Sequence, residues 1–307
     1  MNLRNKYVPF FITGLGRSGT TLLRLMISSH PNIAIPYESH FIDDYQKKLS
    51  NYGDLKKRHN LKKLVSDILS EETIKMWDHI FSEEQTISRI RERSLRGVLD
   101  AIYSEYAEFK GKIRWGDKSD YLDGIPEINA VFPDARFVHI IRDGRDVIKS
   151  VNMLNWGPND LIAGANWWAE YVRLGRRLGA LLGPDRYIEV RYEDLVTNPV
   201  EELTKICHFL EEEFSDKMLH YYQESKELIP QKRRGQHYNT DKPLQNSRAF
   251  SWKTEMSKVD VQIFDRYAGK ILRDCGYEKP IKSVPKPLEA IRILQIMASR
   301  LIKSPYS

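Results

Sequence analysis

A glycine-rich turn between two apolar runs most constrains how this chain can fold. Residues 14–21 read Gly-Leu-Gly-Arg-Ser-Gly-Thr-Thr, follow the apolar segment 8–12 and lead into the apolar segment 22–27. This order predicts a strand, a tight turn and a helix, so that backbone N–H groups and the helix N-terminus converge on one point. Such a point is a ready site for a phosphate group.

The turn departs at one position from the Walker A pattern G-x-x-x-x-G-K-[ST]. Gly14, Gly19 and Thr21 match the pattern, but Thr20 stands where the pattern has lysine. That lysine normally reaches the β- and γ-phosphates of a nucleoside triphosphate. Its absence favours a different polyanion, although a P-loop kinase that lacks the lysine stays open as an alternative.

Composition and charge favour a cytoplasmic protein that binds an anion. The 307 residues carry a net charge of +6 and include only two cysteines, which cannot form a disulfide framework. We expect no metal, because no Cys/His spacing fits zinc, and no nucleic acid partner. The first six residues contain no secretory signal, and no apolar run approaches the ~20 residues of a membrane span.

Five strand candidates alternate with helical patterns along the chain. They are residues 8–13, 33–35, 113–115, 136–141 and 186–190. This alternation predicts an α/β fold with a P-loop-type parallel sheet flanked by helices. Residues 42–112 contain no strand candidate and are expected to form a helical insertion between the early strands.

The remaining chain predicts helices at 171–182, 199–210 and 259–275, and a long polar loop at 229–251. We expect one α/β domain over residues 1–279, followed by a Pro-rich linker and a C-terminal helix within 280–307.

That C-terminal helix is amphipathic. One face of residues 288–303 bears the apolar side chains of Leu288, Ile291, Leu294, Met297 and Leu301. We expect this face to dock on the core, with a membrane surface or self-association as the alternative.

A second phosphate-type site follows the fourth strand candidate. Arg142 comes directly after residues 136–141, and a helix is expected to begin near Asp143. Ser150 lies about two turns into that helix, so it and Arg142 can face one anion at a strand's carboxyl end, where open α/β sheets bind ligands. The alternative is that Asp143 only caps the helix and the arginines pair with surface acids.

In this order, the two motifs resemble those of the sulfotransferases that use 3′-phosphoadenosine-5′-phosphosulfate (PAPS). The chain most resembles bacterial members and the tyrosylprotein and carbohydrate branches, from about residue 8 to 277 apart from the insertion. The resemblance implies that the R-S-G-T-T loop holds the 5′-phosphosulfate, through Arg17, Ser18, Gly19, Thr20 and Thr21. It also implies that the strand-end arginine and the serine eight positions later, Arg142 and Ser150, hold the 3′-phosphate.

Further positions match the family. Tyr192, in a Y-E-D-L segment, is implied to contact the nucleotide, and Lys118, in G-D-K, to lie near the transferring group. Trp252 and Lys253 loosely match the segment that closes over the 3′ side. The resemblance implies PAPS as donor, adenosine 3′,5′-bisphosphate as product and no metal.

The catalytic base is expected just after the second strand. Glu38 stands 21 residues after Arg17 and matches the glutamate base of the tyrosylprotein branch. His40 is the alternative, because cytosolic phenol and steroid members use histidine. A positioned base contributes typically ~10²–10⁴-fold to proton transfer. Arg17 and Lys118 are expected to stabilise the transferring and leaving groups.

The acceptor is expected to be a glycan, lipid-linked or small-molecule hydroxyl in a bacterial cytoplasm. Residues 42–112 and 229–251 are expected to shape its pocket. Protein-tyrosine sulfation is the nearest alternative. A P-loop nucleotide kinase and a non-catalytic nucleotide-binding protein are the alternatives from other classes.

Overall fold

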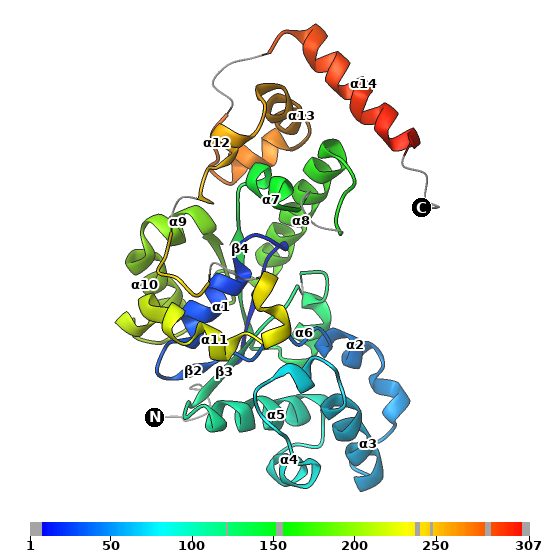
Figure 1. Ribbon diagram of the computed structural model, residues 1–307. Helices are drawn as coiled ribbons and strands as arrows, with labels where there is room; N and C mark the ends of the chain where they lie inside the picture. Colours follow the sequence, from blue (N-terminus) through cyan, green and yellow to red (C-terminus); the bar gives the residue numbers. More distant parts are fainter. Residues whose placement is uncertain are drawn as a thin grey trace.

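A five-stranded parallel sheet forms the centre of the molecule and is covered by helices on both faces (Figure 1). The computed structural model describes residues 8–120, 122–151, 156–236, 240–245, 248–279 and 284–302. The strands are β1 (Phe10–Thr13), β2 (Ile33–Ala34), β3 (Arg114–Lys118), β4 (Arg136–Ile141) and β5 (Tyr187–Arg191).

The strand order is β2-β3-β1-β4-β5, and every recorded pair is parallel. The predicted α/β class and all five strand positions are therefore confirmed, although β3 extends to Lys118 where the sequence indicated an end at Trp115. Because the strands are parallel, their carboxyl ends lie along one edge of the sheet.

Alternate side chains of the strands enter different layers of the core. Phe11 and Phe137 pack in the cluster on the insertion side of the sheet, whereas Phe10, Ile12 and Ile140 pack in the cluster on the opposite side. Both faces are buried, which explains why these strands read as continuous apolar runs.

Helices on the two faces complete the α/β layers. They are α1 (Thr20–Ser28), α6 (Ile125–Val131), α7 (Gly144–Val151), α8 (Leu161–Leu182), α9 (Tyr192–Thr197), α10 (Pro199–Phe209), α11 (Ser225–Leu228), α12 (Trp252–Glu255) and α13 (Lys258–Asp274), with 3-10 turns at Asp216–Gln223 and Gln231–Gln236.

The predicted helical insertion is present. It contains α2 (Ile42–Lys47), α3 (Arg58–Leu69), α4 (Glu83–Arg89) and α5 (Leu95–Phe109), with 3-10 turns at Leu49–Tyr52 and Ile74–Met76. The Ser94 hydroxyl caps α5 by accepting the Gly97 N–H. Tyr103 of α5 stacks on Trp115 of β3 with ring centroids 4.5 Å apart, which attaches the insertion to the sheet.

One expected boundary was wrong. Helix α8 begins at Leu161, ten residues before the expected start, because the Asp160 carboxylate accepts the Ile162 and Ala163 N–H groups and caps the helix there. The expected loop at 229–251 contains the 3-10 turn at Gln231–Gln236, while residues 237–239 and 246–247 lie outside the described chain.

The C-terminal helix, α14 (Lys286–Ile302), packs against α13, but with a different face from the expected one. Its buried residues are Glu289 and Ile296, whereas Leu294 is 65% exposed. Leu288, Ile291 and Met297 are also exposed, and the side chain of Leu301 lies outside the description. The docking prediction was wrong because buried polar contacts of Glu289 to α13 set the rotation of the helix.

Candidate active site

The predicted site residues lie along the carboxyl edge of the sheet. The glycine-rich turn follows β1, Glu38 follows β2, Lys118 ends β3, Arg142 follows β4 and Tyr192 follows β5. Parallel pairing therefore brings together segments that are up to about half the chain apart.

The glycine-rich turn places an open helix end at this edge. Arg17 and Gly19 have positive φ values of 73° and 95°, and α1 begins directly afterwards at Thr20. Within the described residues no side chain caps α1, and its first turn contains no acid, so its N–H groups favour an anion. A Cβ on Gly19 would lie 2.5 Å from the Tyr192 ring, so this close approach requires glycine.

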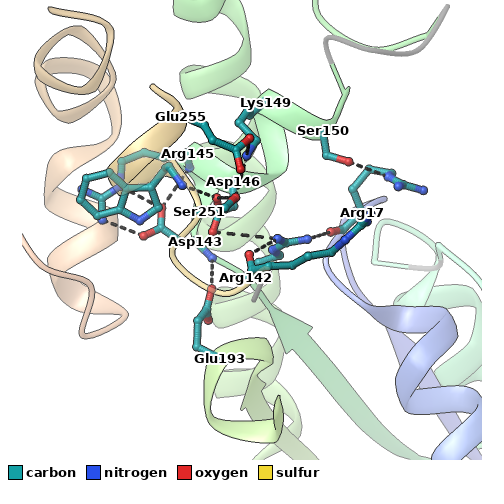
Figure 2. Close-up of polar contacts among 12 residues, drawn as sticks. Arg17, Arg142, Asp143, Arg145, Asp146, Lys149, Ser150, Glu193, Ser251 and Glu255 are labelled. Carbon is teal, nitrogen blue, oxygen red and sulfur yellow. Dashed lines mark hydrogen bonds and ion pairs between the residues drawn. The ribbon is translucent and has the colours of Figure 1, made fainter. Parts of the chain in front are cut away.

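Four predicted residues, Arg17, Arg142, Ser150 and Tyr192, meet here and form what we term the phosphate-side cluster (Figure 2 shows the first three). Arg17 Nε donates to Ser150 Oγ at 2.9 Å, and an Arg142 guanidinium nitrogen donates to the Arg17 carbonyl at 3.1 Å. The Arg142 guanidinium lies 4.5 Å from the centre of the Tyr192 ring. Two cations, a hydroxyl and an open helix end thus converge.

The segment with the predicted Trp252 and Lys253 is attached beside this cluster. Asp146 Oδ1 accepts the Ser251 hydroxyl at 2.7 Å and the Trp252 N–H at 2.8 Å. The Arg145 guanidinium stacks 3.5 Å from the centre of the Trp252 ring, and Lys253 pairs with Glu278 at 2.9 Å. The structure therefore gives both side chains protein partners; their contact with a nucleotide stays a prediction.

Two buried acids that the sequence analysis missed, Asp143 and Glu193, directly follow the cluster residues Arg142 and Tyr192 in the chain. Asp143 and Arg145 form a fully buried ion pair at 2.7 Å. Glu193 accepts the Asp143 N–H and the Tyr277 hydroxyl, each at 3.0 Å, and burial raises the pKa of Glu193 to about 7. The available signal was the acids inside the R-D-G-R and Y-E-D-L segments.

Glu38, His40 and Lys118 form a second group, the base-side cluster. Lys118 Nζ pairs with one carboxylate oxygen of Glu38, and His40 Nε2 lies 2.9 Å from the other. Burial raises the pKa of Glu38, but the charge of Lys118 and the hydrogen bonds from His40 and Lys118 outweigh burial and hold the pKa well below its usual value. Glu38 is therefore ionised at neutral pH.

Hydrogen bonds from β3 fix the backbone beside Glu38. Ser39 Oγ donates to the buried Asp117 carboxylate at 2.8 Å. Ser119 Oγ accepts the N–H groups of Ser39 and His40, both at 3.1 Å. Asp117 and Ser119 flank Lys118 in the sequence, so the polar G-D-K-S run at the end of a strand was the signal for these positioning residues.

A cavity of about 590 Å³ lies between the insertion and residues 226–234, beside Glu38's neighbour Tyr37. Its lining includes the aromatic side chains of Trp77, Tyr106 and Phe109. Lys110, Lys226 and Arg234 add positive charge, and Asp78 and Glu227 add negative charge. The cavity is therefore large enough for a small ligand and amphipathic in character.

The described residues contain neither a metal-binding cluster nor a membrane-spanning helix. No group of three or more His, Cys, Asp and Glu side chains is placed to bind a metal ion there. No described helix combines the length and apolarity needed to cross a membrane.

Comparison with known proteins agrees with the geometry. The model of the family described as "Sulfotransferase family" matches residues 9–216. A protein-tyrosine sulfotransferase of Drosophila melanogaster is 26% identical over 223 residues, covering 71% of this chain but only 41% of that protein. Nodulation protein NoeE of Sinorhizobium fredii is 23% identical over 295 residues, covering 89% of this chain and 66% of that protein.

A solved structure shares the fold. The sulfotransferase domain from the curacin biosynthetic pathway superposes with a TM-score of 0.59 at 20% identity, covering 89% of this chain and 99% of that domain. Since the family model covers more than half of the chain, the relationship does not depend on one distant pair.

Proposed function

This chain belongs to the sulfotransferase family, and we propose that it transfers the sulfuryl group of PAPS to an acceptor hydroxyl with Glu38 as general base. The acceptor oxygen bonds to sulfur as the bond from sulfur to the 5′-phosphate oxygen breaks in line. The hydroxyl proton passes to Glu38, and adenosine 3′,5′-bisphosphate leaves. The observation behind this proposal is the partly buried Glu38–Lys118 ion pair on the strand edge that also bears the open end of α1.

The phosphate-side cluster fits the donor. The open end of α1 suits one phosphate, and Arg142, Ser150 and Arg17 supply the cations and hydroxyl that a second phosphate needs. PAPS, when bound, supplies the activated sulfuryl group. Ser18, Thr20 and Thr21 are assigned to the same binding loop, and Tyr192, Trp252 and Lys253 to the nucleotide.

The base-side cluster gives Glu38 a charge state that depends on Lys118. With Lys118 paired to it, Glu38 is ionised but is a weak base, because its pKa is held low. When Lys118 moves towards negative charge on the sulfuryl or leaving group, Glu38 loses its counter-ion and its pKa rises. The same lysine therefore stabilises developing charge and strengthens the base.

The cavity beside Tyr37 is the proposed acceptor site. Its aromatic walls suit the face of a sugar or phenol ring, so a glycan, lipid-linked or small-molecule hydroxyl is favoured. Similarity to the Drosophila melanogaster protein makes protein-tyrosine sulfation the second candidate. A cytoplasmic, bacterial setting stays a prediction from the sequence.

Ligand-induced stabilisation tests the donor site. We expect adenosine 3′,5′-bisphosphate to raise the melting temperature without Mg²⁺, since a ligand at a hundred times its Kd adds roughly 2.7 kcal/mol. ADP with Mg²⁺ is the control for a nucleotide kinase. If ADP with Mg²⁺ stabilises the protein and the bisphosphate does not, the proposal is contradicted. If the bisphosphate stabilises the protein but no tested acceptor leads to release of bisphosphate from PAPS, the protein is a non-catalytic nucleotide-binding protein.

A further inference from the structure

Helix α14 turns an uncharged apolar face away from the protein. At 3.6 residues per turn, Ala290, Ile291, Leu294, Met297 and Ala298 share the side opposite the buried Glu289 and Ile296. All five are exposed, and Leu294 is 65% exposed. Monomeric proteins rarely leave such a continuous row of large apolar side chains in water, so this row indicates an interaction surface.

Directed polar contacts hold the helix in this rotation. Glu289 receives a hydrogen bond from Gln262 at 2.6 Å and pairs with Arg266 at 2.7 Å, both on α13. Arg292 pairs with Asp260 of α13 at 2.8 Å. Burying the apolar row against the core would break these contacts, so its exposure is built into the packing.

The charges around the row are mainly positive. Glu289 and Asp260 are each paired with an arginine across this junction, and Glu255, which lines the same cavity as Asp260, is paired with Lys149. Residues 286–303 include four basic residues, Lys286, Arg292, Arg300 and Lys303, against one acid, Glu289, and Lys286 is exposed beside the row. An apolar face bordered by basic side chains is the arrangement of helices that lie in the plane of a lipid interface.

We propose that α14 binds the surface of an anionic membrane, with Ile291, Leu294 and Met297 inserted among the acyl chains and the basic border facing the headgroups. A second copy of the chain fits the charge less well, because two copies joined through this face would bring their basic borders together. Figure 1 shows α14 at the end of the molecule opposite α3 and α4, where a flat surface can approach it. This proposal is independent of the reaction catalysed.

Vesicle flotation tests the proposal on the full chain. We expect binding to vesicles of phosphatidylcholine with phosphatidylglycerol, and weaker binding to phosphatidylcholine alone or at high salt. The double variant Ile291→Asp/Leu294→Asp should lose at least about tenfold in vesicle affinity, because it places charge in the acyl region. The matched control is Ile80→Asp/Leu181→Asp, at positions 94% and 80% exposed elsewhere, which should bind like the parent protein.

Circular dichroism and melting temperature establish that both double variants are folded. Equal binding of the α14 variant and the control, or no binding by the parent protein, overturns the proposal. Light scattering supplies the competing outcome: a dimer that only the α14 variant dissociates, without vesicle binding, would assign the face to a second copy.

Discussion

The phosphate-side and base-side clusters lie on one sheet edge but are held in different ways. Arg142 donates to the backbone carbonyls of Arg17 and Arg248 and pairs with the buried Asp146 at 3.9 Å. Around Glu38, the main contact is between two side chains, Glu38 and Lys118, that compensate each other's charge. The first arrangement is fixed by the fold, whereas the second can change when another negative charge arrives.

This difference separates binding from catalysis. A preorganised group of cations binds a polyanion without rearrangement, so residues on the phosphate side should determine nucleotide affinity and stability. A side-chain ion pair that exchanges partners acts on the proton and the developing charge, so residues on the base side should determine kcat.

Glu38→Gln gives the largest expected effect. Removing a positioned base should lower kcat by ~10²–10⁴-fold, while the Kd for adenosine 3′,5′-bisphosphate changes little because the phosphate-side cluster is intact. Rates of bisphosphate release from PAPS with acceptor and calorimetric titration of the product measure the two quantities. An equal loss of nucleotide affinity and of kcat would contradict the assignment of binding to one cluster and catalysis to the other.

The matched variant for that experiment is His40→Asn. His40 is 45% exposed and has a φ of 57°, which asparagine tolerates better than most residues. We expect only a few-fold change in kcat, since His40 donates to Glu38 and does not replace it. The opposite ranking, with His40→Asn the slower enzyme, would make His40 the base.

Glu193 should give the phosphate side a pH-dependent stability. Its pKa is raised by burial to about 7, from an ordinary value of 4.5. Between these values the unfolded chain has released the proton and the folded chain has kept it, so stability falls as pH rises from about 4.5 to 7. The expected loss is on the order of 3 kcal/mol.

Urea unfolding at pH 5 and pH 8 measures this effect. Glu193→Gln should lose less stability between the two pH values than the parent protein, because its side chain does not titrate. Glu170→Gln, which alters an exposed ion pair with Arg173, is the control and should follow the parent protein. Identical pH dependence in parent and Glu193→Gln would show that Glu193 is ionised in the folded state.

The same division separates what the sequence predicted from what it did not. Strands, the insertion and the strand-end residues were predictable because each depends on a local run, such as residues 14–21 or 136–141. The sequence did not predict the burial of the Asp143–Arg145 pair or the exposure of the apolar face of α14. Both depend on which segments, distant in the sequence, pack against these residues. From sequence alone, an acid within a polar motif is expected to face solvent and an apolar helix face is expected to be buried. Only the tertiary packing determines whether each expectation holds.

Ser150 offers the most specific test of the phosphate side. Its hydroxyl accepts a hydrogen bond from Arg17 at 2.9 Å, and we assign both residues to phosphate binding. Ser150→Ala should weaken the binding of adenosine 3′,5′-bisphosphate by about tenfold, which corresponds to the loss of one hydrogen bond to a charged group. Adenosine 5′-phosphate, which lacks the 3′-phosphate, should bind parent and variant equally in calorimetric titration. Equal weakening of both nucleotides would instead mean that Ser150 acts only by orienting Arg17 at the glycine-rich turn, and the 3′-phosphate would then have to be assigned to Arg142 alone.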